Sequence, residues 1–186
     1  SGLALITGVM FARFSRPRSS IVFAAYPVSH VADGRHILMI RMANARMNMI
    51  SEASAKLRLI RTENSSSLGQ FRKIYDMRLE REQHPMFVLG WSLIHVIDES
   101  SPLFDETSAS LKNRDAALIL SIEGVDETTN QTQRARHYYP CELIRWNHRY
   151  VDIFGLDEEH IQHIHYSKFH DSEEMEKSLL AENVQD

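Results

Sequence analysis

Beyond Ser20, apolar residues recur mostly at every second position, which predicts β-strands rather than helices. From Ala55 to Leu59 the apolar side chains alternate with basic ones, and Asp76 to Glu80 repeats this alternation. Such a pattern is typical of a strand with one face in a core and the other in water. Larger side chains continue the alternation at Phe87, Leu89, Trp91 and Leu93.

Short apolar runs bounded by turn residues predict further strands at residues 37–42, 117–122 and 150–154. Asp33 and Gly34 suit the two-residue turn of a hairpin, and the small polar residues 64–69 are typical of a flexible loop. Many short strands at this spacing favour a β-sandwich, so the fold class is predicted to be mainly β.

Two short segments are predicted to be helical. Ser108 to Arg114 is the first, and the second would begin at Asp171 or Ser172 as its cap and continue towards the end of the chain. The apolar positions of the second helix would be Met175, Leu179 and Leu180.

The beginning of the chain carries an apolar stretch of another kind. Residues 2–12 have no charge, and as a helix they would extend roughly 16 Å, about half of a bilayer core. Arg13, Arg16 and Arg18 follow, and basic residues beyond an apolar helix mark its cytoplasmic end. Pro17 would end this helix. We expect the end of a transmembrane helix, with an amphipathic or core helix of a soluble domain as the alternative.

These patterns divide the chain into four parts. We expect the cytoplasmic end of a transmembrane helix at 1–14, a linker at 15–20, a cytoplasmic β-sandwich at 21–170 and an acidic helix or tail at 171–186. The last part holds six acidic residues and one lysine, whereas three arginines precede the first acidic residue, Asp33. One end of the chain is therefore basic and the other acidic.

The composition limits the classes of protein that fit. The chain has 186 residues, 43% of them hydrophobic and 25% charged, which suits one globular domain with appendages. A net charge of −4 disfavours a general nucleic-acid binder. The single cysteine, Cys141, cannot form an intrachain disulfide and fits a reducing compartment. We expect it to be a buried structural thiol rather than a nucleophile.

Enzyme motifs are scarce in this sequence, which contains no nucleophile elbow, Walker loop, Rossmann glycine pattern or CxxC pair. The strongest metal candidate is the group His160, His163 and His165, with His170 nearby. On a strand, His163 and His165 share a face and His160 does not, so three converging ligands require a turn. A solvated histidine-rich edge is the preferred interpretation, and a zinc-dependent enzyme is an alternative.

Three stretches in sequence order resemble the prokaryotic branch of the inward-rectifier potassium channels. The segment FARFSRP at 11–17 is similar to the junction between that family's inner pore helix and its cytoplasmic domain. The second stretch, HVIDESSPLF at 95–104, is close to the family signature HxIDxxSPLY. The third stretch comprises Ile122-Glu-Gly124, Glu127-Thr-Thr129, Ala135-Arg136, Tyr139, Trp146 and His148-Arg-Tyr150. A further segment, RMANAR at 41–46, is similar to the family's RVGNLR segment and gives weaker support.

The resemblance implies an immunoglobulin-like cytoplasmic β-sandwich, assembled as a homotetramer whose central channel extends the pore of a prokaryotic inner membrane. It implies K⁺ as the permeant ion, Mg²⁺ or polyamines as blockers, no cofactor, no resident metal, no nucleic-acid partner and no covalent reaction. The family's pore helix and TVGYG filter are not found in this sequence. We therefore expect the chain to be part of a longer channel.

The resemblance also assigns candidate residues inside the pore. Glu52 and Glu123 match acidic pore-lining positions that would concentrate K⁺ and hold Mg²⁺ or polyamines. We expect the glycine after Glu123 to let the backbone approach the pore axis closely. The family's constriction loop matches Gly124, Val125, Asp126, Glu127, Thr128, Thr129 and Asn130, and its polar residues disfavour a gate that works by dewetting.

Basic residues form the remaining candidates. Arg13, Arg16 and Arg18 match part of a stretch that binds phosphoinositides in eukaryotic relatives, and each would contribute about 1 kcal/mol at an anionic leaflet. Arg46 and Arg136 match basic positions near the subunit interface and the membrane-facing loops. The alternative function is a membrane-tethered immunoglobulin-like binding module without a pore, which predicts a monomer or dimer.

Overall fold

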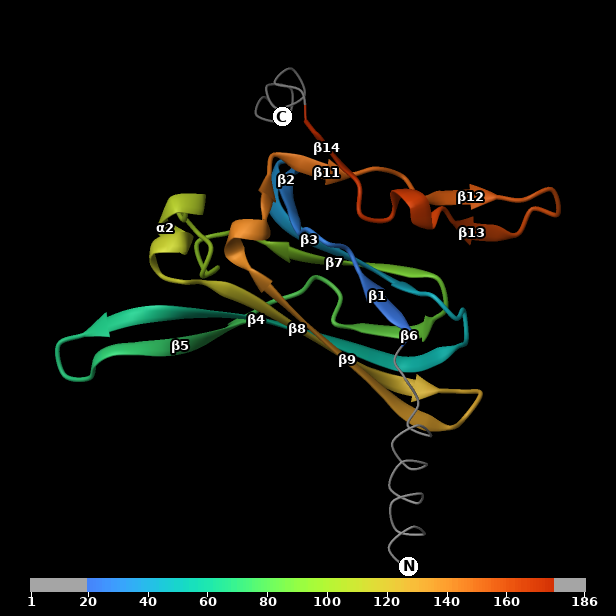
Figure 1. Ribbon diagram of the computed structural model, residues 1–186, viewed down its shortest axis with the longest axis horizontal. Helices are drawn as coiled ribbons and strands as arrows, with labels where there is room; N and C mark the ends of the chain where they lie inside the picture. Colours follow the sequence, from blue (N-terminus) through green and yellow to red (C-terminus); the bar gives the residue numbers. More distant parts are fainter. Residues whose placement is uncertain (1–19, 176–186) are drawn as a thin grey trace, which may run out of the picture.

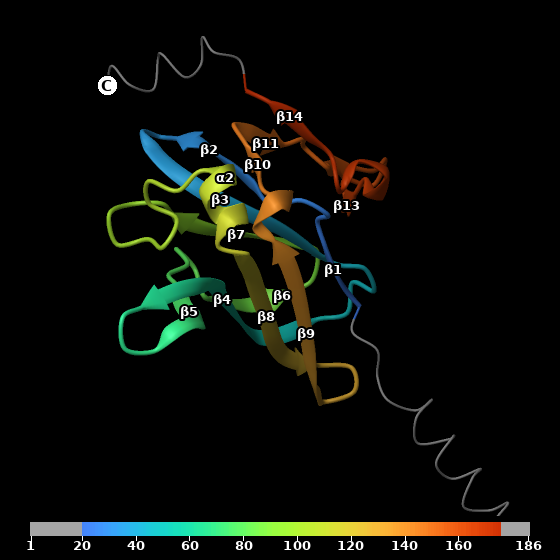
Figure 2. The same cartoon turned by 60° about the vertical axis from the view of Figure 1, so that its left-hand side comes forward.

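The structure, a computed structural model, describes residues 20–175 and consists mainly of β-strands arranged in two facing layers (Figures 1 and 2). The first sheet contains β1 (Ile21–Phe23), β2 (Val28–Ala32), β3 (Arg35–Asn44), β7 (Gly90–Val96) and β10 (Arg145–Trp146). The second sheet contains β4 (Ile50–Ser65), β5 (Gly69–Met77), β6 (Gln83–Phe87), β8 (Ala117–Asp126) and β9 (Gln131–Pro140). The predicted mainly β sandwich is confirmed.

Each sheet is organised around one long strand. In the first sheet, β3 pairs with β7 along one edge and with β2 and β1 in succession along the other, while β10 adds parallel to β2. In the second sheet, β4 pairs with β8 along one edge and with β5 and β6 along the other, and β9 pairs with β8. The sixteen residues of β4 are long enough to serve two partners on one edge.

The core lies between the two sheets. Apolar side chains at alternating positions of β4 and β8 point inward, as with Leu57 and Leu59 of β4 and Leu118 and Leu120 of β8, all at most 3% exposed. Tyr139 is also fully buried, and its hydroxyl donates to the carbonyl oxygen of Ala24 at 2.5 Å. Burial of these side chains is the main force that holds the sheets together.

The C-terminal segment covers the outer face of the first sheet. It contains two antiparallel pairs, β11 (His148–Tyr150) with β14 (Ser172–Glu174), and β12 (Phe154–Leu156) with β13 (Gln162–Ile164). A second apolar cluster forms beneath it, and the buried guanidinium of Arg41 donates to Val151 O at 2.6 Å and Phe169 O at 2.5 Å. Both faces of β3 are therefore buried, which explains its nearly continuous apolar sequence.

Helical structure is short. Helix α2 (Ser108–Asn113) agrees with the first predicted helix and begins with a capping box in which Thr107 and Ser110 satisfy each other's backbone N–H groups. Single turns of 3₁₀-helix occupy Cys141–Leu143 and Tyr166–Lys168. No helix within residues 20–175 has the length and apolar character needed to cross a bilayer. The predicted transmembrane helix end, at 1–14, lies outside the described residues.

The hairpin predicted at Asp33 and Gly34 is confirmed, because both residues have positive φ, 51° and 73°, between β2 and β3. The predicted flexible loop at 64–69 is instead the tight end of the β4–β5 hairpin, since the two strands pair as far as Ser65 and Gly69.

Other predicted elements are wrong in their extent. Strand β5 ends at Met77 rather than continuing to Glu80, the run from Phe87 to Leu93 is split between β6 and β7, and residues 150–154 are divided between β11 and β12. Ser172 does not cap a helix but lies in β14, because residues 172–174 hydrogen-bond with β11. Tertiary pairing at residues 172–174 overrides a local helix signal. The rest of the predicted helix, with Leu179 and Leu180, lies outside the described residues.

Candidate functional site

Glu52 lies in a β-bulge near the start of β4. Ser51 pairs with Val125 of β8 and Ser54 pairs with Glu123, so Glu52 and Ala53 together oppose the single residue between them on β8. The backbone of Glu52 adopts the left-handed conformation, with φ of 48°. A bulge of this kind changes the direction in which the side chains on its strand point.

The bulge turns the Glu52 carboxylate away from the core. Ile50 and Ala53 are both buried although they are three positions apart, so the simple alternation of a strand is interrupted between them. Without the extra residue, Glu52 would lie on the same face as Ile50, which is the core face. The side chain is exposed instead, and within residues 20–175 it has no ion-pair partner.

Glu123 is also exposed but its carboxylate is paired. It lies opposite Arg134 in the β8–β9 register, and Arg134 Nε is 3.2 Å from Glu123 Oε2. The two side chains are 54% and 75% exposed respectively, so the ion pair is solvated and contributes at most about 1 kcal/mol. The negative charge of Glu123 is thus partly offset within its own protomer.

Further basic side chains share this outer face of the second sheet. Lys56 of β4 and Arg136 of β9 flank Ser121 of β8 in the paired register. Together with Ser54, Glu123 and Arg134 they line a shallow, open hollow. The outer face therefore carries mixed charge, with Glu52 and Glu123 at the end nearest the β8–β9 turn.

The residues predicted to form the constriction loop are only partly a loop. Gly124, Val125 and Asp126 belong to β8, and the turn itself contains Glu127, Thr128, Thr129 and Asn130. Hydrogen bonds close this turn, from Thr128 N to Asp126 Oδ1 at 2.9 Å and from Asn130 N to Asp126 O at 2.7 Å. The first three of the seven residues matched to the constriction loop therefore extend the sheet, and the last four form its turn.

Asp126 anchors this turn to a neighbouring one. Hydrogen bonds to its carboxylate, chiefly from the Asn48 side chain and then from Thr128 N, hold the pKa of Asp126 below its usual range. Glu127 N donates to Met49 O at 3.0 Å, which ties the same two turns together through the backbone. Sequence reasoning missed Asn48, because its contact depends on the pairing of β4 with β8.

Gly124 is required by packing inside the protomer. A Cβ atom at this position would lie 2.5 Å from Ile50 Cγ2 and 3.1 Å from Ala53 Cα, on the bulged part of β4. Gly124 is therefore explained by the close approach of β8 to the bulge. The expected reason, close approach of the backbone to a pore axis, is not needed to account for it.

The basic candidates lie apart. Arg46 is exposed in the turn between β3 and β4, whereas Arg136 is exposed in the middle of β9, and no contact within residues 20–175 joins them. Arg13, Arg16 and Arg18 lie outside the described residues.

The signature segment at 95–104 has a structural role. Nδ1 of the buried His95 lies 2.6 Å from Arg78 O, and its Nε2 lies 2.7 Å from Ser101 Oγ. Ser101 Oγ also accepts from Leu103 N at 3.1 Å. Because Arg78 O can only accept, His95 donates from Nδ1 and accepts at Nε2, and burial lowers its pKa. The histidine thereby fixes the conformation of the segment that follows β7.

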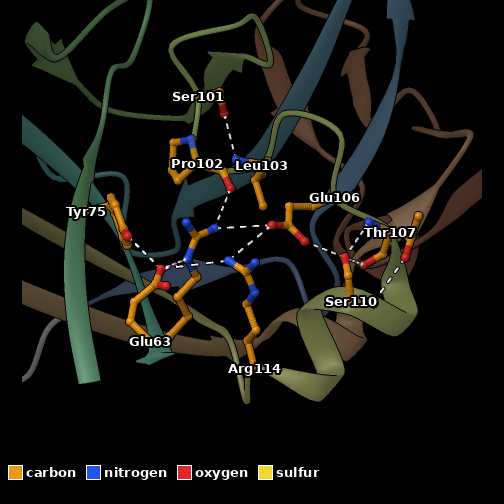
Figure 3. Close-up of polar contacts among 10 residues, drawn as sticks. Glu63, Tyr75, Ser101, Pro102, Leu103, Glu106, Thr107, Ser110 and Arg114 are labelled. Atoms are coloured by element: carbon orange, nitrogen blue, oxygen red, sulfur yellow. Dashed lines mark hydrogen bonds and ion pairs between the residues drawn. The ribbon is translucent and has the colours of Figure 1, made fainter. Parts of the chain in front are cut away.

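An ion-pair network attaches this segment to the second sheet (Figure 3). Arg61 of β4 donates to Pro102 O at 2.9 Å and lies 2.7 Å from Glu63 and 3.4 Å from Glu106. Arg114, just after α2, bridges the same two carboxylates at 3.8 and 3.5 Å. Two bases and two acids therefore join β4, the signature segment and α2.

The enzymatic candidates are not supported. Within residues 20–175, no three histidine, cysteine, aspartate or glutamate side chains are placed to hold a metal ion together, so the three-histidine zinc site is not formed. Cys141 is 1% exposed, and burial raises the pKa of its thiol to about 12. This confirms the expectation of a buried structural thiol.

Comparison with known proteins identifies what the sandwich is similar to. Residues 21–186 match the family model described as the inward rectifier potassium channel C-terminal domain. The chain is 35% identical over 170 residues to the inward rectifier potassium channel Kirbac3.1 of Paramagnetospirillum magnetotacticum, covering 91% of this chain. It is 32% identical over 174 residues to the human ATP-sensitive inward rectifier potassium channel 8, covering 89% of this chain.

These comparisons confirm the resemblance to prokaryotic inward rectifiers found in the sequence motifs. The chain spans 58% of the length of the Paramagnetospirillum relative and 41% of the human one. The relatives are channels rather than enzymes, which agrees with the expectation that no covalent reaction is catalysed.

Proposed function

Because the chain belongs to the C-terminal domain family of inward rectifier potassium channels, we propose that four copies form the cytoplasmic part of a K⁺ conduction pathway. Identical sandwiches arranged head to tail close into a ring through one repeated interface. Any exposed carboxylate that faces the axis of such a ring is repeated four times. The membrane-embedded part of the pathway would come from the rest of a longer protein in a prokaryotic inner membrane.

The observation that carries this proposal is the exposure of Glu52 and Glu123 beside one another in the β4–β8 register. Glu52 is in the bulge, and Glu123 pairs with Ser54, two positions further along β4. Neither carboxylate contributes to the core, and the bulge that exposes Glu52 leaves a residue unpaired in the sheet. A role in attracting cations accounts for two acidic side chains at this place.

A ring of these carboxylates can stay ionised if the passage contains water. Two carboxylates ~10 Å apart repel by about 0.4 kcal/mol in bulk-like water and by about 1.7 kcal/mol at an effective dielectric constant near 20. Both energies are small enough for K⁺ to offset. Mg²⁺ or a polyamine carries more charge, would bind more tightly and would obstruct outward current.

The two acidic positions would contribute unequally. The Glu123 carboxylate is paired with Arg134, whereas Glu52 has no ion-pair partner within residues 20–175. Glu52 would therefore supply most of the uncompensated charge, and Glu123 would add to it to the extent that its partner moves away.

The experiment that tests the pore role replaces both acids by amides in the full-length channel. Glu52→Gln with Glu123→Gln should weaken block by Mg²⁺ or spermine, measured as a shift in the voltage dependence of current in planar bilayers. Asp76→Asn is the matched control, since this exposed carboxylate lies on β5 and, among the residues that the structure describes, forms an ion pair only with Arg58. An unchanged block in the double variant would contradict the assigned role.

Assembly has its own test. The 186-residue chain should form tetramers on crosslinking followed by mass measurement, and the full-length channel in detergent should do so as well. A full-length protein that stays monomeric or dimeric would support the alternative, a membrane-tethered immunoglobulin-like module without a pore.

The three arginines before the sandwich would attract the domain to the membrane surface. Together Arg13, Arg16 and Arg18 could supply roughly 3 kcal/mol per subunit at an anionic leaflet. Sedimentation with vesicles of phosphatidylglycerol should therefore recover the chain better than sedimentation with phosphatidylcholine vesicles. Replacing all three by glutamine should remove the difference, and a retained difference would exclude this role.

A further inference from the structure

Two histidines stand side by side on the β12–β13 hairpin, which projects from the sandwich in Figure 1. His163 lies within β13, opposite Gly155 of β12 in the antiparallel register. His165 follows two positions later, and its backbone N–H donates to Ile153 O at 2.8 Å. The antiparallel pair and this hydrogen bond place both imidazoles on the same side of the hairpin.

The imidazoles converge on a space left open by the glycine. A Cβ atom at Gly155 would lie 2.6 Å from His165 Nε2 and 3.0 Å from His163 Nε2. The two nitrogens therefore lie near a common point, where any other residue would place its side chain. The ring centroids are 4.6 Å apart and the rings are nearly perpendicular, at 77°.

Neither Nε2 atom has a hydrogen-bond partner among the described residues. Within residues 20–175, no hydrogen bond or ion pair reaches the imidazole of His163 or His165, and Nδ1 of His163 is buried without a partner. His165 is exposed and His163 is partly exposed, so a ligand from solution can reach the two nitrogens. This arrangement suits a ligand that accepts nitrogen lone pairs.

We propose that His163 and His165 bind one late first-row divalent metal ion, of the Zn²⁺, Ni²⁺ or Cu²⁺ type, through their Nε2 atoms. Imidazole nitrogen suits these ions, whereas Mg²⁺ and Ca²⁺ prefer oxygen ligands. Zinc–nitrogen bonds of about 2.0–2.1 Å require two ligand nitrogens roughly 3.4 Å apart, which small rotations of the two side chains can supply. Water would complete the coordination, since the described residues offer no third side-chain ligand.

This two-histidine site differs from the three-histidine zinc site of an enzyme that the sequence offered as an alternative. His160 lies in the turn of the same hairpin with φ of 64°, and it does not join the pair. The site is independent of the pore proposal, because it lies on the C-terminal segment and shares no residue with the acidic positions of β4 and β8.

The test uses the 186-residue chain without a polyhistidine tag and ZnCl₂ as the probe in isothermal titration calorimetry. His163→Gln and His165→Gln should each weaken the affinity of the tightest Zn²⁺ site by at least about tenfold. Replacing a residue that only hydrogen-bonds to a metal ligand already lowers metal affinity by that factor, and these variants remove a ligand itself. His160→Asn is the matched control from the same hairpin and should leave the affinity unchanged.

Gly155→Ala tests whether Zn²⁺ binding requires the two imidazoles to approach a common point, rather than only the presence of two histidines. It keeps both imidazoles but places a methyl group between them, so it should weaken Zn²⁺ binding as much as His163→Gln. Circular dichroism checks that each variant is folded. As a second measurement, Cu²⁺ added to the wild-type chain should show hyperfine coupling to two nitrogens in electron paramagnetic resonance.

Equal Zn²⁺ affinities for the wild-type chain and the His163→Gln variant would overturn the proposal. Coupling of Cu²⁺ to one nitrogen, or the same two-nitrogen signal in the His163→Gln variant, would do so as well.

Discussion

Arg134 Nε lies 3.2 Å from Glu123 Oε2, directly across the β8–β9 pair, so an acidic residue assigned to the pore carries its own counter-ion. Nothing in the local sequence reveals this pairing, since the two residues are joined only by the register of the hairpin. The ion pair reduces the net negative charge that Glu123 contributes to this surface.

Removal of the Arg134 charge should strengthen cation block in the full-length channel. In Arg134→Gln the Glu123 carboxylate loses a partner worth about 0.2–1 kcal/mol, so the affinity for Mg²⁺ should rise by up to about fivefold. Current recordings over a range of Mg²⁺ concentrations measure this affinity. Arg136→Gln, two residues along the same strand and opposite Ser121, should have a smaller effect, because Arg136 has no acidic partner in the part of the chain that the structure describes. Weaker block in Arg134→Gln would contradict the prediction.

Addition of a methyl group at Gly124 should destabilise the sandwich. The new Cβ of Gly124→Ala would meet Ile50 Cγ2 at 2.5 Å, and overpacking of this kind costs about 1–3 kcal/mol. Urea denaturation followed by tryptophan fluorescence measures the loss in unfolding free energy. Ile50→Ala, which removes Cγ2, should cost less in the Gly124→Ala background than alone. If the two losses in unfolding free energy simply add, the clash with Ile50 Cγ2 is not the cause of the destabilisation.

Loss of Arg61 should cost far more stability than loss of Arg58 on the same strand. The Arg61 side chain is 11% exposed and pairs with Glu106, which is 12% exposed, so its removal leaves a nearly buried carboxylate short of a partner. The expected cost of Arg61→Met is about 3 kcal/mol. Arg58 pairs with Asp76, which is 91% exposed, so Arg58→Met should change stability by less than about 1 kcal/mol. Equal decreases in the thermal midpoint for the two variants would show that the Arg61 ion pairs stabilise the fold no more than the exposed pair of Arg58.

Acid should weaken the same network. Hydrogen bonds from Tyr75 and then Arg61 hold the pKa of Glu63 below its usual range. A carboxyl group with a lower pKa in the folded state stabilises the protein above its unfolded pKa, and that stabilisation disappears as the pH falls towards the folded pKa. The stability difference between wild type and Glu63→Gln should therefore shrink below about pH 4.5. Urea unfolding at pH 7, 5 and 4 measures it, and a constant difference would exclude Glu63 as its source.

Cys141 should react with thiol reagents only after unfolding. Burial raises the pKa of its thiol to about 12, so roughly a thousandfold fewer thiolates exist than at the ordinary value, and the sulfur is covered. Because this is the only cysteine in the chain, absorbance with Ellman's reagent reports it alone. The native chain should label at the rate of global unfolding, and urea should raise that rate steeply. Rapid labelling in the native state would show that the site opens locally.

Local patterns predicted the interiors of several elements well. The alternation around Ala55 to Leu59 agrees with β4, the apolar run 117–122 with β8, and Ser108 to Arg114 with α2, because side-chain period and turn chemistry act over a few residues. The ends of elements were less predictable. Ser172 is a good helix cap in isolation, yet β11 offers its backbone hydrogen bonds in a sheet.

The candidate site shows the same division. Motifs alone assigned Glu52 and Glu123 to one acidic surface, but the bulge that exposes Glu52 depends on how β4 pairs with a strand more than sixty residues away. Likewise, the partner of Glu123 and the contact between Asn48 and Asp126 exist only because β8 pairs with β4 and β9.

By itself, the sequence determined the family, the mainly β class and the positions of most strand interiors, since these follow from ordered motifs and from the spacing of apolar side chains. Only the tertiary structure decided which charges are free, which are paired and which donors meet, as with Arg134 at Glu123 and with His163 and His165 above Gly155. The physical reason is that ion pairs and metal ligands require approach within a few ångströms, and the register between strands distant in the chain sets that approach.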